Sequence, residues 1–281
     1  MMNGSPERLL GSNYLTLSSQ YRLFKHVISD KIDTHWHDFF EMGCIVSGMG
    51  WHIVNGQPFR LQPGMVFLLT PADFHELYPD EGQTIELFDF IFDDSFIRPA
   101  IHESLFGHSG LFLHTFEGEG ARRLEAEFST IWDETQHWQF GSDIVVQGSF
   151  ERILVHLARQ LGANRSDDKA GLKETIQPSI RKALLYIQHH FREPVTLAVA
   201  ADYAGLSANY FSECFRKQVG LSYQEYLNDR RLQFASALLR SSELPVTEVC
   251  FAAGFNTIPH FDRVFKRKFG SSPREYRKQR G

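Results

Sequence analysis

The sequence has few cysteines and no long apolar run. Of its 281 residues only three are cysteine, and Cys44, Cys214 and Cys250 are far apart with no C-x-x-C pattern among them. Neither a disulfide framework nor a thiolate zinc site is therefore predicted. No apolar stretch reaches the roughly 18 residues of a membrane span, and the start, MMNGSPERLL, lacks the apolar core of a signal peptide. We expect a soluble, cytoplasmic protein with no membrane partner.

Signatures of catalysis are also missing. The chain has no phosphate loop, no paired-carboxylate signature and no Ser-His-Asp or Cys-His pattern of a nucleophilic enzyme. We therefore expect a protein that is not an enzyme and needs no cofactor. Hydrophobic residues make up 42% of the chain and aromatic residues 14%, which is enough apolar surface for folded cores. The length suits two domains better than one.

Charge is divided unevenly along the chain. The overall net charge is −5, but residues 1–172 carry 12 Lys and Arg against 24 Asp and Glu, whereas residues 173–281 carry 17 against 10. The first part thus has a net charge of −12 and the second +7. Such a division favours a polyanion as the partner of the second part.

The composition also marks a domain boundary. The stretch GANRSDDKAG, residues 162–171, is small and polar and has no apolar periodicity, as expected of a linker. Before it, residues 121–161 show helical spacing, with Leu124, Phe128 and Ile131 on one face. Earlier still, short β-branched and aromatic runs are separated by turn signals, which predicts a small antiparallel barrel or sandwich.

The second part contains an internal repeat. Shifting GLSANYFSECFRKQVG by about fifty places aligns it with GFNTIPHFDRVFKRKFG, so that Phe211 matches Phe261 and Phe215 matches Phe265. Each copy predicts a short helix that ends at a glycine, a tight turn and a second helix whose phenylalanines share a buried face. Two helix-turn-helix units are the simplest interpretation.

The opposite face of each second helix is polar or basic. A short exposed helix of this kind can enter the DNA major groove, where polar side chains read base edges and cations neutralise phosphates. For a single copy an ordinary solvated face is an equally good interpretation, but two copies in the basic part favour DNA binding. The predicted contacts are Asn209, Ser212, Glu213, Arg216, Thr257, Ile258, Arg263 and Lys266.

This region resembles the double helix-turn-helix domain of AraC/XylS-type bacterial transcription regulators. The matching positions extend over about 80 residues at the end of the chain, and Pro259 and His260 replace the serine and aromatic residue usual in the family. The resemblance implies two recognition helices on one face of double-stranded promoter DNA, and RNA polymerase as a further partner. It rests on Gly254, Phe255, Phe261, Arg263, Phe265, Lys266, Phe269, Gly270, Pro273, Tyr276 and Arg277.

A second group of residues lies in the first part, in THWHDFFEMGCIVSG. His35, His37 and Glu41 fall at alternate positions of a strand pattern, which predicts that they face one side of a sheet, with Trp36 packing on the other. His75 follows from PADFH. The spacing resembles the two cupin motifs, in which three imidazoles and a carboxylate hold a divalent ion.

Three interpretations of these four side chains remain open. They line a metal-free effector pocket, they bind a metal, or they are structural. The pocket is favoured, with a sugar or a related small polar metabolite as the effector and with no metal ligand assigned. The alternative function is a metal-dependent cupin enzyme fused to a DNA-binding domain.

Together these features predict an α+β protein with two domains. Residues 1–161 would form an antiparallel cupin-like β-barrel with flanking helices that binds an effector and dimerises, residues 162–173 a linker, and residues 174–281 an all-α domain with two helix-turn-helix units. We expect a homodimer that pairs through the helices of residues 121–161, with Leu124 and Phe128 in the contact.

Overall fold

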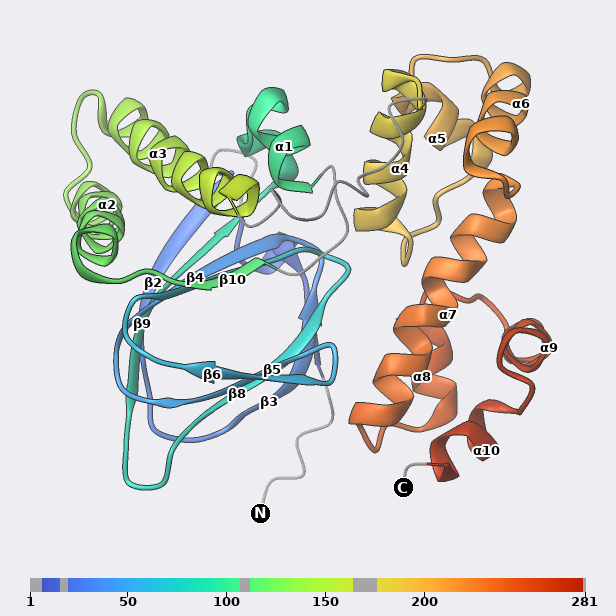
Figure 1. Cartoon of the computed structure of the whole chain (residues 1–281), viewed down its shortest axis with the longest axis horizontal. Helices are drawn as coiled ribbons and strands as arrows, with labels where there is room; N and C mark the ends of the chain where they lie inside the picture. The colour runs from blue at the N-terminus through green and yellow to red at the C-terminus, as the bar shows by residue number, and fades with distance from the viewer. Residues whose placement is uncertain (1–6, 16–19, 107–111, 164–175, 280–281) are drawn as a thin grey trace.

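The structure is a computed structural model that describes residues 7–15, 20–106, 112–163 and 176–279. It contains a β-barrel domain followed by a helical domain, as Figure 1 shows. The predicted fold class is confirmed. The predicted linker, 162–173, lies outside the described residues except at its start, where a helix continues to Ala163.

The barrel is made of two five-stranded sheets that face each other. One sheet has the strand order β1-β3-β8-β5-β6 and the other the order β10-β7-β4-β9-β2. Among the described residues, all strand pairings are antiparallel except that of β1 with β3. The strands are β1 Glu7–Leu9, β2 Tyr21–Ile28, β3 Ile32–His37, β4 Phe40–Ser47, β5 Gly50–Val54, β6 Gln57–Leu61, β7 Met65–Leu69, β8 Phe74–Pro79, β9 Ile85–Phe92 and β10 Phe112–Thr115.

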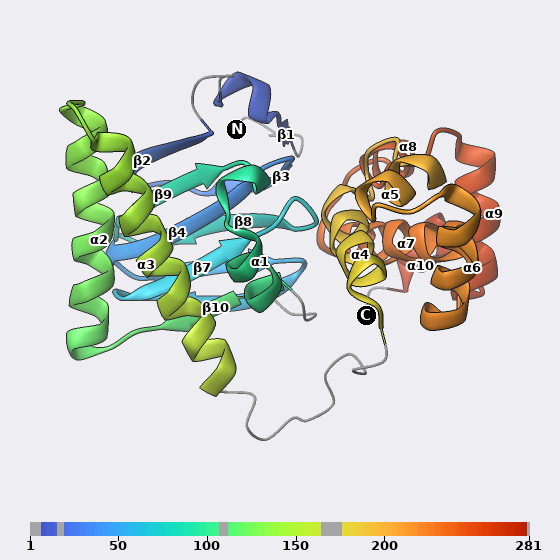
Figure 2. The same cartoon turned by 90° about the horizontal axis from the view of Figure 1, so that it is seen from above.

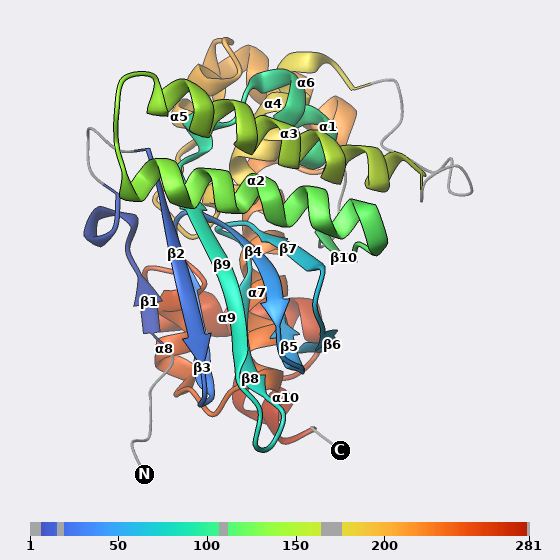
Figure 3. The same ribbon diagram turned by 90° about the vertical axis from the view of Figure 1, so that its left-hand side faces the viewer.

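Two long helices cover the second sheet. Figure 3 shows α2 (Gly118–Gln136) lying across the upper ends of β2, β9 and β4, with α3 (Ser142–Ala163) beside α2. Phe128 is fully buried there, with its ring stacked on that of Phe88 at 5.8 Å between centroids. Leu124 is 1% exposed in the same core. The expectation that Leu124 and Phe128 form a dimer contact is therefore wrong, because these side chains hold α2 on its own sheet.

The helical domain follows with two similar units. Its helices are α4 Pro178–His190, α5 Leu197–Tyr203, α6 Ala208–Val219, α7 Tyr223–Ser241, α8 Val246–Ala252, α9 Ile258–Phe269 and α10 Pro273–Lys278. The repeated phenylalanines form its core, since Phe211, Phe215, Phe261 and Phe265 are all 0% exposed. The helix-turn-helix prediction is thus confirmed.

The repeat also places the same helix ends in both units. Gly220 after α6 and Gly270 after α9 have positive φ angles of 83° and 77°, a left-handed conformation that glycine adopts without steric cost. The next helix then starts with a capping box in each unit. Ser222 accepts from the backbone N–H of Glu225 and Ser272 from that of Glu275 in α7 and α10, while each glutamate accepts from the serine N–H.

The two domains share a packed interface. Trp36 is 6% exposed, and its ring and that of Phe74 each meet Phe234 of α7 edge to face. Trp36 therefore serves packing, as predicted, although its partner belongs to the other domain. Among the described residues, no helix is both long and apolar enough to cross a membrane.

Candidate DNA interface and effector site

The two recognition helices lie on the same side of the helical domain. Figures 1 and 2 both place α6 and α9 on the side that is turned away from the barrel. Their polar faces are open to solvent, since Asn209, Glu213 and Arg216 of α6 are exposed, as are Arg263 and Lys266 of α9. A DNA duplex thus has access to both helices.

The remaining three predicted contacts differ in how exposed they are. Thr257 is exposed as the N-cap of α9, and Ser212 is half-buried. Ile258 is half-buried as well and packs against the core of the helical domain, so that much of its surface is used inside the protein. Pro259 falls in the first turn of α9, where its missing N–H breaks no intrahelical bond, and the helix forms.

An additional residue supports the second recognition helix. His260 lies one turn before Arg263, and the guanidinium Nη2 donates to His260 Nδ1 at 3.0 Å. This bond joins two side chains that lie one turn apart on α9. The sequence marks this histidine only as a departure from the family pattern, but its spacing of three residues from Arg263 is a signal for this contact.

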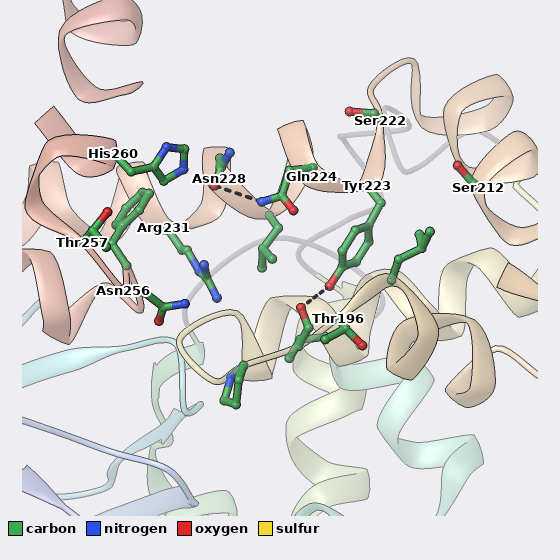
Figure 4. A pocket seen from close by; sticks show the side chains of 15 residues that line it. Thr196, Ser212, Ser222, Tyr223, Gln224, Asn228, Arg231, Asn256, Thr257 and His260 are labelled. Atoms are coloured by element: carbon green, nitrogen blue, oxygen red, sulfur yellow. Dashed lines mark hydrogen bonds between the residues drawn. The ribbon is translucent and has the colours of Figure 1, made fainter. Parts of the chain in front are cut away.

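A cleft of about 590 Å³ lies between the two units and is shown in Figure 4. Arg231 of α7 forms part of its wall and donates to two backbone carbonyls, Phe191 O at 2.7 Å and Glu193 O at 2.9 Å. Burial lowers the pKa of this guanidinium. Because it is engaged in these bonds, Arg231 mainly fixes the segment between α4 and α5.

The barrel contains the second predicted site. His35 and His37 lie on β3, and His75 lies directly opposite His35 on the neighbouring strand β8. Glu41 does not share their strand, because β3 ends at His37 and the chain turns before β4 begins at Phe40 in the other sheet. The predicted common strand face is therefore wrong for Glu41, which reaches the histidines from the facing sheet.

The four side chains nevertheless meet inside the barrel. Glu41 Oε2 is 3.2 Å from His37 Nε2 and 3.5 Å from His75 Nε2. The rings of His35 and His75 have centroids 4.1 Å apart. His37 is 0% exposed, His75 4% and Glu41 8%.

His52 is a further member that the sequence motif did not reveal. It lies on β5, is 0% exposed, and its Nε2 is 2.9 Å from His75 Nδ1. A signal was present in the strand WHIV, since the turn signal at Asn55 and Gly56 fixes the register of this hairpin and the inward phase of His52. We name the five side chains His35, His37, Glu41, His52 and His75 the barrel cluster.

The protonation states in the barrel cluster follow from burial. Burial, aided by the positive potential of His75, lowers the pKa of His35 to about 3 and that of His52 well below its ordinary value. For Glu41 burial alone would raise the pKa, but the neighbouring His75 and His37 outweigh it and hold that pKa well below its usual range. His35 and His52 are therefore neutral near pH 7, and Glu41 is a carboxylate.

Backbone bonds fix the tautomers of two histidines. His35 Nδ1 donates to Asp33 O at 2.9 Å, and His37 Nδ1 donates to Phe39 O at 2.7 Å. His37 Nε2 thereby faces Glu41 Oε2, and a proton, a ligand hydroxyl or a cation can join the two atoms. The ligand atoms of His35, Glu41 and His75 lie within 4.8 Å of one another, so this set can also hold a divalent metal.

Two family models match the chain. One, described as an AraC-like ligand binding domain, matches residues 18–176, which is more than half of the chain, and the other, described as a helix-turn-helix domain, matches residues 200–279. The chain belongs to the AraC family. As a member, it is a ligand-responsive, DNA-binding transcription regulator.

A curated relative and two solved structures are similar to this chain. The HTH-type transcriptional activator RhaS of Escherichia coli O81 (strain ED1a) is 28% identical over 255 residues, which cover 88% of this chain and 87% of that protein. The crystal structure of ToxT from Vibrio cholerae O395 matches at 16% identity over 92% of this chain and 97% of that chain, with a TM-score of 0.41. The C-terminal domain of AraT, a response regulator from Geobacillus stearothermophilus, matches at 34% identity over 38% of this chain and 88% of that chain, with a TM-score of 0.37.

Proposed function

We propose that the barrel cluster binds the effector of this regulator and that the effector is a sugar or a related small molecule with several hydroxyl groups. The observation that carries this proposal is the buried polar group around Glu41. Its carboxylate faces His37 and His75, whose ring Nε2 atoms have no hydrogen bond of good geometry within the described residues. A hydroxyl group donates to one acceptor and accepts from a second group, which suits this arrangement.

The effector site is also connected to the DNA-binding domain. Arg192, between α4 and α5, donates from Nη2 to the carbonyl oxygens of His37, at 2.5 Å, and Pro71. His37 therefore contacts the cluster through its ring and the helical domain through its backbone. A ligand that moves His37 changes the docking of the helical domain. The ligand then binds the two docking states with different affinity, and a ligand response requires that difference.

The two recognition helices, on this proposal, bind successive major grooves of promoter DNA through the predicted contacts. Lys266 and Arg216 neutralise phosphates, while Arg263 and Asn209 read base edges. The protein acts as an activator in the cytoplasm, contacts RNA polymerase and performs no catalysis in its barrel. The similarity to an activator and the exposed polar faces of α6 and α9 support this role.

A carbohydrate library screened by thermal shift tests the effector. A binding sugar raises the melting temperature in proportion to the logarithm of its concentration above the dissociation constant. His75→Ala should weaken that binding by about 1–3 kcal/mol, because a buried polar partner is left unpaired. DNA affinity of the effector-free variant should stay unchanged. If a transition metal copurifies in stoichiometric amount and is lost in His75→Ala, the metal interpretation replaces the sugar one.

We further propose that the chain forms a homodimer through the turn between α2 and α3. Phe140 and Trp138 in this turn are 105% and 62% exposed, and Ile144 at the start of α3 is 72% exposed. Apolar side chains gathered at one end of a helical hairpin suit an isologous contact with the same turn of a second copy. Phe140→Asp combined with Ile144→Asp should yield a folded monomer in sedimentation. A wild-type chain that is monomeric at micromolar concentration, with and without DNA, contradicts this proposal.

A further inference from the structure

A second group of potential metal ligands lies where the two domains meet. Asp94 belongs to the short 3-10 helix η2 (Asp94–Phe96), His102 to α1 (Pro99–Phe106), and His189 to the last turn of α4. The first two residues come from the barrel domain and the third from the helical domain. Their ligand atoms all lie within 4.8 Å of one another.

The contacts of these atoms fit an ion better than a hydrogen-bond network. Asp94 Oδ1 and His102 Nε2 are only 2.7 Å apart, yet they are not aligned for a good hydrogen bond, and both atoms are buried. His189 is 2% exposed, and its buried Nε2 has no hydrogen-bond partner in the described part of the chain. An unpaired buried ring nitrogen costs roughly 1–3 kcal/mol, so a native protein that retains one calls for an explanation.

The surroundings hold the ligands in place close to the protein surface. The ring of His189 packs edge to face on Phe40 and Phe106, with centroid distances of 5.0 and 5.2 Å, which fixes its direction. The side chains of His102 and Asp94 remain 15% and 27% exposed, although their facing atoms, Nε2 and Oδ1, are buried.

We propose that Asp94, His102 and His189 bind a divalent transition metal, with Zn²⁺ as the best match, and that this ion locks the helical domain onto the barrel. Zinc accepts nitrogen and carboxylate ligands in a tetrahedron whose ligand atoms lie roughly 3.3 Å apart, with water in the fourth position. The three ligand atoms already lie within 4.8 Å of one another, so small side-chain rotations bring them to this spacing. Because the ion holds ligands from both domains, it binds the docked arrangement and not the separated one, and it stabilises docking by mass action.

Zinc titration of the chelator-treated full chain by calorimetry, with Co²⁺ absorption as a measure of coordination geometry, tests the site. We expect one equivalent of Zn²⁺ to bind in the wild-type protein. In His189→Gln and Asp94→Asn the affinity should fall by more than the roughly 10- to 100-fold loss typical of outer-shell substitutions. His190→Gln is the matched control, since His190 faces Glu193 instead of the site. The control should retain wild-type affinity.

A structural readout separates ligation from misfolding. Circular dichroism of the metal-free variants checks the fold, and Asp94→Asn, at a partly exposed position, is the milder substitution. Zn²⁺ should slow amide exchange in the domain interface of the wild type and of His190→Gln, but not of Asp94→Asn. Absence of Zn²⁺ binding, or equal binding by wild type and both ligand variants, overturns the proposal. If only His75→Gln loses the bound ion, the ion belongs to the barrel cluster, and this result also overturns the proposal.

Discussion

Removing the guanidinium of Arg192 should loosen the contact between the two domains. This side chain is the polar centre of the interface, where Nη2 donates to His37 O and Pro71 O and the guanidinium carbon lies 5.1 Å from the centroid of the Phe234 ring. Arg192→Met keeps the length and much of the apolar contact. It removes both hydrogen bonds and the charge.

Two opposing contributions set the magnitude. Each hydrogen bond from a charged donor stabilises by about 1.5–3 kcal/mol, and each carbonyl left without a donor in a buried place is itself unfavourable. Burial of the guanidinium opposes this, since it lowers the pKa of Arg192 to about 9, and methionine avoids that desolvation cost. Because two carbonyls lose their donor at once, we expect a net loss of about 1–3 kcal/mol in docking, equivalent to roughly 5- to 150-fold in the docked population.

Amide hydrogen exchange on the full chain measures this effect. Protection at residues 36–39 and 71–74, which border the interface, should fall by that factor in Arg192→Met, whereas protection inside α2 and α3 should stay unchanged. Lys182→Met is the matched control, because Lys182 is an exposed cation on α4 that contacts only the Tyr203 ring among the described contacts. Equal protection in wild type and Arg192→Met, or the same change in the control, refutes the reasoning.

Three further outcomes are expected. Phe128→Ala should lower the free energy of unfolding by about 3–5 kcal/mol without changing the oligomeric state in sedimentation, since the ring is core. Burial, aided by Glu41, raises the pKa of Asp89 from 3.8 to about 6, so its ionised carboxylate destabilises the fold progressively as the pH rises from about 4 to 6. In urea melts, Asp89→Asn should therefore stabilise the protein by about 2–3 kcal/mol at pH 8 and have no such effect at pH 4. Arg263→Ala should weaken binding by about 1–3 kcal/mol at one base position, whereas Lys266→Ala should weaken all sequences alike and reduce the salt dependence in fluorescence anisotropy.

The helical domain was the most predictable part because its signals are local. The spacing of Phe211 and Phe215 places both rings on one face of a helix whatever surrounds it, and the glycine and serine at each helix end act within a single turn. The same pattern occurring twice then fixed the architecture. The predicted DNA contacts were obtained from these helices by subtraction, as positions outside the predicted core, and Ile258 shows the limit of that step because it packs against the core.

The barrel site was predicted only in part, because its members come from different sheets. A period of two in the sequence correctly placed His35 and His37 on one face, but the turn at Asp38 and Phe39 interrupts the strand, and Glu41 reaches its partners across the barrel. Strand alternation contains no information about which sheet a strand joins. His52 shows the same limit, since its contact with His75 depends on the pairing of β5 with β8.

The cluster of Asp94, His102 and His189 could not be predicted from any sequence motif. Its first and last members are almost a hundred positions apart and belong to different domains, so that only the packing of the domains brings them together. Local pattern determines each domain, but the contact between domains depends on a few side chains such as Trp36, Phe234 and Arg192 whose roles are invisible before both folds exist. The proposed effector site and the proposed metal site both adjoin this contact, so both proposals predict that their ligands change it.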